Sequence, residues 1–236
     1  MNDQNREVLG ILGGMGPLSS AEFLKTIYEY TLGDREQDSP IVLMYSDPTF
    51  PDRTTAFLAG EENGVLEQLV VALRRLVDMG ATRIVMCCMT VHHLHPLLPD
   101  DLRAIVEPLP DVIFRQLASA EGRYLVVCSN GTRAFRLLER HPAWAAESEH
   151  VVLPDPEDQA AIHRDLIYPM KRVCDLDRPA AQLEELLDRY GVDGFIVGCS
   201  EVHILAKHFF SRERRHGCID PFAAIARELA REPAAV

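Results

Sequence analysis

The chain has 236 residues, and with 47% hydrophobic and 25% charged residues its composition is that of an ordinary globular protein. Its 36 Asp and Glu outnumber its 24 Lys and Arg, so the formal net charge is −12. Such a charge repels a phosphate backbone or an anionic lipid surface, and we therefore expect neither nucleic acid nor membrane as a partner.

The sequence shows no targeting signal, and together with the cysteine content this favours the reducing interior of a cell. Residues 1–7 are polar and lack the apolar core of a signal peptide, and no apolar run approaches the roughly 18 residues of a membrane-spanning helix. We expect a cytoplasmic protein. In that setting free thiols are favoured over a disulfide framework, so each cysteine is a candidate for chemistry: Cys87, Cys88, Cys128, Cys174, Cys199 and Cys218.

Short apolar runs alternate with amphipathic stretches in the first half of the chain. The predicted elements are a strand at 8–12, a glycine turn at 13–17, a helix from Ser19, a strand at 41–45, a loop at 49–54, a helix at 66–79 and a strand at 84–88. Strands that alternate with helices are typical of a parallel α/β sheet.

The second half repeats this plan, with a strand at 124–128 and a turn at 129–132. Residues 76–92 align with residues 187–203 at a constant offset, and the alignment pairs Cys88 with Cys199. The duplication predicts an α/β protein of two similar lobes, each a mostly parallel sheet flanked by helices. We expect the lobes to be related by a pseudo-twofold axis, with the active site in the cleft between them. The N-terminal lobe is predicted to span residues 1–115 and the C-terminal lobe 116–215, with a C-terminal helix at 216–232 packed back on the N-terminal lobe.

In each predicted lobe a helix leads through a glycine into a strand that delivers a cysteine to its carboxyl end, where ligands bind in open parallel sheets. We therefore expect the side chains of Cys88 and Cys199 to lie at the ligand-binding edge of their sheets. If helices begin at the next residues, backbone N–H groups would lower the pKa of each thiol from about 8.5. Cys87, Cys128, Cys174 and Cys218 are interpreted as core residues.

Six motifs appear in order along the chain: residues 10–17 (GILGGMGP), 51–54 (PDRT), 88–92 (CMTVH), 129–132 (SNGT), 167–171 (IYPMK) and 198–201 (GCSE). With these motifs the chain resembles the cofactor-independent aspartate/glutamate racemase family. The resemblance implies an isomerase that interconverts the L and D forms of an acidic amino acid without pyridoxal phosphate or a metal. Aspartate is slightly preferred over glutamate as the substrate, and a homodimer is expected.

The resemblance also implies roles for particular residues. Cys88 and Cys199 would be the two acid/base thiols, and Arg53 and Lys171 would recognise carboxylates. The residues expected to contact substrate are Met15, Arg53, Thr54, Met89, Thr90, Ser129, Thr132, Lys171, Ser200 and Glu201.

Two positions depart from the family pattern, since Met89 replaces the usual asparagine and Ser200 the usual threonine. Methionine cannot donate a hydrogen bond. Two alternatives therefore stay open: a family member with a changed substrate or reaction, such as a decarboxylase or another isomerase, and an amino-acid-binding protein with impaired catalysis.

Other readings of the same residues are less favoured. His92, His93 and His95 beside Cys88 are ligand types for zinc, but their spacing fits poorly. The glycine turn lacks the third glycine of a dinucleotide-binding motif. His92 and His203 are interpreted as helix-start residues that hydrogen-bond near the thiols, while Asp47 and Glu201 either orient a neighbour or cap a helix.

Overall fold

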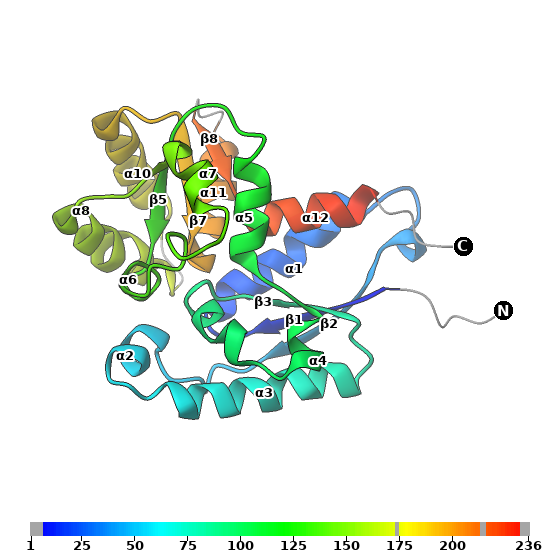
Figure 1. Cartoon of the computed structure of the whole chain (residues 1–236). Helices are drawn as coiled ribbons and strands as arrows, with labels where there is room; N and C mark the ends of the chain where they lie inside the picture. Colours follow the sequence, from blue (N-terminus) through cyan, green and yellow to red (C-terminus); the bar gives the residue numbers. More distant parts are fainter. Residues whose placement is uncertain (1–6, 173–174, 213–215, 232–236) are drawn as a thin grey trace.

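The computed structural model describes residues 7–172, 175–212 and 216–231, which form two lobes, each built on a four-stranded parallel sheet (Figure 1). The first sheet has the order β2-β1-β3-β4, with β1 at Val8–Gly13, β2 at Ile41–Ser46, β3 at Arg83–Met86 and β4 at Val106–Glu107. The second has the order β6-β5-β7-β8, with β5 at Tyr124–Cys128, β6 at Val151–Val152, β7 at Gly194–Gly198 and β8 at Gly217–Ile219.

The two sheets share one strand order, in which the first strand of each lobe pairs with the second and the third. The central strands β1 and β7 consist of apolar residues and glycine, as expected where both faces of a parallel sheet are covered. The predicted fold class, two similar parallel α/β lobes, is thereby confirmed.

Helices cover both faces of the first sheet and surround the second (Figure 1). The longer helices are α1 (Pro17–Thr31), α3 (Glu62–Asp78), α5 (Leu109–Leu117), α10 (Asp177–Tyr190), α11 (Ser200–Phe210) and α12 (Pro221–Arg231). The shorter ones are η1 (Glu36–Asp38), α2 (Arg53–Leu58), η2 (Thr90–Leu97), α4 (Asp100–Arg103), α6 (Asn130–Ala134), α7 (Trp144–Glu147), η3 (Ser148–His150), α8 (Pro156–Ala161), the π-helical turn η4 (Ile162–Ile167) and α9 (Tyr168–Met170).

The hydrophobic core consists of two clusters. The smaller lies between the first sheet and α3 and contains Leu12, Leu69 and Leu73. The larger is continuous between the lobes, because residues of α1 and α12 such as Phe23 and Phe222 belong to it together with residues of the second sheet. Packing of apolar side chains thus joins the two lobes away from the strand ends.

The C-terminal segment differs in detail from the prediction of a helix at 216–232. Gly217–Ile219 pairs with β7 as strand β8, and the helix begins only at Pro221. This helix, α12, runs beside α1, with the ring of Phe222 edge-on to Phe23 at 5.1 Å (Figure 1). The predicted lobe boundary at residue 115 falls within α5, and the division of the chain at that residue stays a prediction.

Among the described residues, none of the helices combines the length and the apolar character that crossing a membrane requires.

We predict that α12 contributes strongly to stability through Phe222, which is 1% exposed. The substitution Phe222→Ala leaves a cavity against Phe23, so the free energy of unfolding should fall by about 3–5 kcal/mol in a denaturant titration. Val71→Ala on the exposed side of α3 is the control, and it should change that free energy by less than about 0.5 kcal/mol. Similar losses in both variants would contradict this account of the core.

Candidate active site

A small pocket lies where the carboxyl ends of the two sheets face each other. It is lined by Met15, Asp52, Arg53, Thr54, Cys88, Thr90, Ser129, Tyr168, Lys171, Cys199, Ser200 and Glu201. The structure therefore brings together every predicted site residue except Met89 and Thr132. The cavity volume is only about 20 Å³, which is room for about one water molecule.

The cysteine pair reaches the pocket because of where the strands end. Cys88 follows β3 by two residues, and Cys199 directly follows β7. The segment after Cys88 is the 3₁₀ helix η2, whereas Cys199 is the N-cap residue of α11. Cys87 instead belongs to the larger core cluster while Cys88 belongs to the smaller one, so adjacent side chains point to opposite sides.

Arg53 places a positive charge beside Cys88. Its guanidinium donates from Nη1 to the carbonyl oxygen of Pro51 at 2.6 Å and from Nη2 to that of Met15 at 2.9 Å, which fixes the side chain. Burial alone would lower the pKa of Arg53, but the negative charge available on Cys88 raises it. Within the described part of the chain Nε has no partner, so this edge of the guanidinium remains available to a ligand.

Cys199 has the opposite electrostatic environment, because its neighbour is a carboxylate. Its thiol donates a hydrogen bond to Oε2 of Glu201 at 2.9 Å, and the hydroxyl of Ser200 donates to the same oxygen at 3.2 Å. Burial and the charge of Glu201 raise the pKa of Cys199 well above its ordinary value. The expectation of a lowered pKa for this thiol is therefore wrong: burial and a carboxylate outweigh the helix N-terminus.

Glu201 is 2% exposed, and it also provides the contact between the lobes at the glycine turn. A Cβ atom at Gly16 would lie 2.2 Å from Oε1 of Glu201, so only glycine allows this approach. Oε1 itself has no hydrogen-bond partner among the described residues. A buried carboxylate oxygen without a partner is a strong acceptor for a cationic ligand group.

Three hydroxyl groups join the lobes on another side of the pocket. Thr90 of the first lobe lies 3.0 Å from both Ser129 and Thr132 of the second, and the latter two lie 3.3 Å apart. Ser129 also caps α6 by accepting from the backbone N–H of Thr132. Thr132 does not line the pocket, and it positions the two hydroxyls that do.

Lys171 is held over the pocket by two residues that the sequence analysis did not assign. Its ammonium lies 3.4 Å from Oδ2 of Asp52 and 4.3 Å from the centre of the Tyr168 ring, and the Tyr168 hydroxyl donates to the same carboxylate oxygen at 3.0 Å. Burial opposes the charge on Lys171, but Glu201 above all, then Tyr168 and Asp52, raise its pKa. Asp52 and Tyr168 belong to the motifs at 51–54 and 167–171, and this position in the sequence could have identified them as site residues.

Met89 lies apart from the other residues expected to contact substrate, and its contact with substrate stays a prediction. Its side chain is 1% exposed and packs in the larger core cluster, and it does not line the pocket. An apolar side chain suits this position, so Met89 contributes packing and not a missing polar contact.

The remaining cysteines that the structure describes and Asp47 lie outside the pocket. Cys87 and Cys128 are core residues as predicted, and burial raises the pKa of Cys128 to about 12. Cys218 is partly buried, all five described cysteines are free, and Cys174 lies outside the described residues. Asp47 orients the following loop, since its carboxylate accepts from the backbone N–H of Thr49 at 2.9 Å.

His92 and His203, expected to hydrogen-bond near the thiols, have different surroundings. His203 is fully buried one turn into α11 and contacts Asp220 at 2.7 Å and Thr26 at 2.9 Å. The ring of His92 faces the backbone of Met86, and neither ring nitrogen forms a well-aligned hydrogen bond within the described residues. Across residues 7–172, 175–212 and 216–231, no group of three or more His, Cys, Asp or Glu side chains is arranged to hold a metal ion.

Comparison with known proteins places this geometry in context. The sequence model of a family described as Asp/Glu/hydantoin racemase matches residues 12–229. Among solved structures, the Picrophilus torridus aspartate racemase is similar with a TM-score of 0.79 and 21% identity, covering 97% of this chain and 96% of that one. An aspartate racemase homologue from Pyrococcus horikoshii has a TM-score of 0.65 and 18% identity, with 94% and 97% covered. The glutamate racemase from Campylobacter jejuni has a TM-score of 0.61 and 18% identity, with 97% and 87% covered. At these identities the structural likeness establishes the fold.

We predict that the ion pair of Asp52 makes stability depend on pH in the acid range. Hydrogen bonding by Thr55 and the charge of Lys171 outweigh burial and lower the pKa of Asp52 from 3.8 to about 2. A carboxylate with a lowered folded-state pKa stabilises the protein above its unfolded pKa, and this contribution is lost as the pH falls through about 2.

Because the Asp52 side chain is about one third exposed, we expect a contribution of only about 1 kcal/mol. Asp52→Asn keeps a side chain that can cap α2 and removes the charge. Denaturant titrations should show wild type more stable by that amount at pH 6, and this difference should be much smaller at pH 2. A difference that is independent of pH would contradict the assignment.

Proposed function

Because the chain belongs to the Asp/Glu/hydantoin racemase family, we propose that it interconverts the L and D forms of an acidic amino acid, aspartate in preference to glutamate, without a cofactor. The observation that carries the proposal is the lining of one pocket by Cys88 from the first lobe and Cys199 from the second. A thiol on each side allows one to remove the α-proton while the other returns a proton to the opposite face.

The electrostatic difference between the two thiols suggests how they divide the work. Arg53 places its positive charge beside Cys88, while the thiol of Cys199 donates a hydrogen bond to Glu201. In one direction Cys88 takes the α-proton, the electron pair of the broken C–H bond is delocalised onto the α-carboxylate, and Cys199 donates its proton to the other face. The return direction starts from the Cys88 thiol and the Cys199 thiolate.

The remaining pocket residues match the groups of an acidic amino acid. The free edge of Arg53 and the ammonium of Lys171 are suited to the two carboxylates, and the unpartnered Oε1 of Glu201 is suited to the ammonium group. These contacts to developing negative charge favour the carbanion-like transition state, which is the largest demand of this reaction.

A cavity of about 20 Å³ does not admit an amino acid, so substrate entry requires the lobes to separate at the pocket. The contacts that must give way join Asp52 to Lys171 and Thr90 to Ser129. The substrate carboxylate then competes with Asp52 for Lys171. Closure on the substrate would exclude water from the reacting carbon.

Two further expectations belong to this proposal, a homodimer and a cytoplasmic location. The alternative of an impaired amino-acid-binding protein was motivated by Met89, whose position in the core removes that motive. The alternative of another reaction on the same scaffold is distinguished by the products of the following experiment.

We expect the protein to exchange the α-proton of aspartate with solvent. Incubation of L- or D-aspartate in deuterium oxide, followed by mass spectrometry and chiral separation, should show deuterium at Cα and the formation of the other enantiomer. Alanine serves as the control without a side-chain carboxylate. If no acidic amino acid takes up deuterium, although calorimetry shows that it binds, the protein is a binding protein; faster turnover of alanine would refute the roles of Arg53 and Lys171.

Each thiol should be indispensable for racemisation. In Cys88→Ser or Cys199→Ser the hydroxyl is a far weaker base than a thiolate, so the rate should fall by about 10²–10⁴. Each variant should retain α-proton exchange with one enantiomer only, and the two variants should select opposite enantiomers. Cys87→Ser is the matched control and should keep its activity. Activity that survives in Cys88→Ser but is lost in Cys87→Ser would show that the assignment within this pair is wrong.

A further inference from the structure

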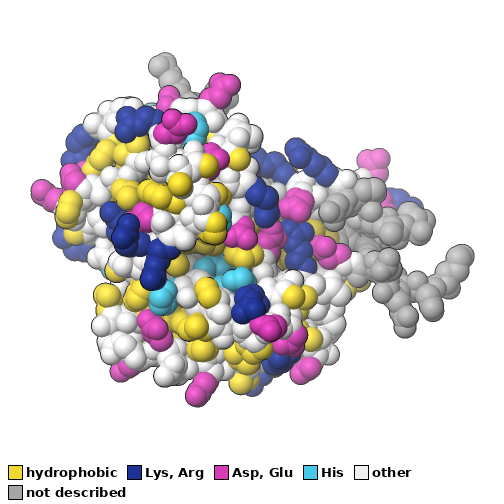
Figure 2. All heavy atoms as spheres, viewed as in Figure 1, with side chains coloured by type: hydrophobic (Ala, Val, Ile, Leu, Met, Phe, Trp, Pro, Cys, Tyr) yellow, Lys and Arg dark blue, Asp and Glu magenta, His cyan; other side chains and the backbone are white. Residues whose placement is uncertain are grey.

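A second and much larger hollow lies between the lobes, on the other side of η2 from the thiols. Its volume is about 500 Å³, against about 20 Å³ for the pocket with the two cysteines, and the two share no lining residue. We call it the histidine pocket, and it is lined by His92, His93, His95, Pro96, Pro108, Pro110, Asp111, Leu137, Arg140, His141 and Pro142. Figure 2 shows histidine side chains gathered where the two lobes meet.

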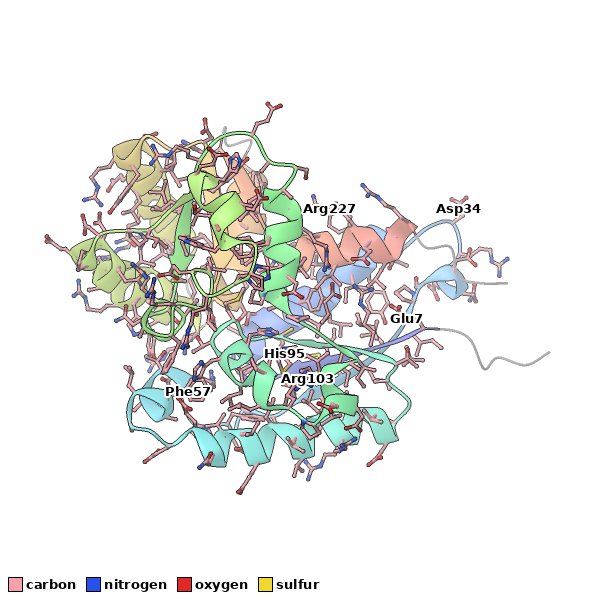
Figure 3. The ribbon with its side chains drawn as sticks, in the orientation of Figure 1. Glu7, Asp34, Phe57, His95, Arg103 and Arg227 are labelled. Atoms are coloured by element: carbon pink, nitrogen blue, oxygen red, sulfur yellow. The ribbon has the colours of Figure 1, made fainter. Side chains whose placement is uncertain are left out.

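Two imidazole rings of the histidine pocket have ring nitrogens without a well-aligned hydrogen bond to a described residue. His92 is 4% exposed, and its ring faces the backbone of Met86, yet neither ring nitrogen forms a well-aligned hydrogen bond with a described residue. The same holds for buried Nε2 of His95, whose ring lies near the backbone of Arg103 and Val106. Figure 3 labels His95 at the junction of the lobes. Burial lowers the pKa of His95 and lowers that of His92 to about 3, so both rings are neutral at neutral pH. A neutral imidazole carries one donor and one acceptor, and leaving them unmet costs about 1–3 kcal/mol.

The rim of the histidine pocket provides an unpaired positive charge. Asp111 is already engaged by His141, whose Nδ1 accepts from the backbone N–H of Ala143 at 3.1 Å and whose Nε2 therefore donates to Asp111 at 2.9 Å. His93 contacts Glu62 at 3.1 Å. Arg140 is exposed and has no ion-pair partner within the described ranges, so its guanidinium is available to an anion.

The walls between floor and rim are flat and apolar. They consist of the rings of Pro96, Pro108, Pro110 and Pro142 and the side chain of Leu137. Proline rings pack well against planar groups, and they offer no donor that would favour a strongly hydrated ligand. No group of three or more His, Cys, Asp or Glu side chains among the described residues is arranged to hold a metal ion, at this pocket or elsewhere.

We propose that the histidine pocket binds a small planar organic anion, an aromatic or heteroaromatic carboxylate with a hydroxyl or ring N–H group remote from the carboxylate. The carboxylate pairs with Arg140, the ring lies against the prolines, and the remote group exchanges hydrogen bonds with His92 and His95. A hydroxyl suits a neutral imidazole because it both donates and accepts. This site is independent of the proposed racemase activity.

The same two segments line both pockets, so a ligand in the histidine pocket can influence the catalytic pocket. The helix η2 presents Thr90 to the catalytic pocket and His92 to the histidine pocket. Residues 137–142 follow α6, which holds Thr132 against Thr90. An occupant that contacts Arg140 and His92 bridges the lobes, so it should stabilise their closed arrangement and bind together with an amino acid without competing.

The probe for this proposal is 4-hydroxybenzoate. Calorimetry on the full chain should detect binding at one site, and NMR of ring ¹⁵N-labelled histidine should show shifts for His92 and His95. Benzoate lacks the hydroxyl and 4-hydroxybenzyl alcohol lacks the charge, and each should bind about 10-fold more weakly or worse. Absence of binding by 4-hydroxybenzoate at millimolar concentration, or equal binding of all three compounds, would overturn the proposal.

Variants locate the site without endangering the fold. Arg140→Gln changes an exposed side chain and should weaken binding of 4-hydroxybenzoate at least 10-fold, whereas Arg136→Gln, four residues away and outside the pocket, should leave it unchanged. Equal affinity in both variants would overturn the assignment. Saturating aspartate should leave the affinity for 4-hydroxybenzoate equal or higher, and a competitive loss would place the probe in the catalytic pocket instead.

Discussion

The carboxylate of Glu201 is buried between the lobes, where it accepts hydrogen bonds from Cys199 and Ser200 and shares a small pocket with Arg53 and Lys171. A buried charge costs several kcal/mol unless opposite charge and donors surround it. Glycine at position 16 allows the carboxylate to approach the turn of the other lobe. The lobes must therefore meet closely enough to bury this group, and that closeness brings both cysteines into one pocket.

The duplicated lobes supply equivalent thiols in unequal surroundings. At the offset that pairs Cys88 with Cys199, Glu201 corresponds to Thr90, so a carboxylate stands beside one thiol and a hydroxyl at the same position beside the other. Arg53 adds its charge on the side of Cys88. A reaction that needs one base and one acid gains from this difference, because a proton already resides on one of two chemically identical groups.

Each lobe has its own sheet, and two kinds of contact join one lobe to the other. Apolar packing of α1 and α12 is continuous with the core of the second lobe. At the pocket the contacts are polar, with Asp52 bound to Lys171 and Thr90 to Ser129. Polar contacts can be replaced by hydrogen bonds to water or to a ligand at little net cost in free energy. Exposing packed apolar side chains to water costs more. Separation at the pocket with the apolar side intact is the movement that this division favours.

The sequence by itself determined the two parallel sheets, the internal repeat and the placing of Cys88 and Cys199 at strand ends. These follow from hydrophobic periodicity and from the rule that parallel strands end at one edge. The tertiary structure alone decided that Met89 lies in the core, that Asp52 and Tyr168 hold Lys171, and that Cys199 has a raised pKa. A side chain's direction after a strand, its partners across a cleft and the cost of its charge depend on groups distant in the chain, and no local pattern encodes them.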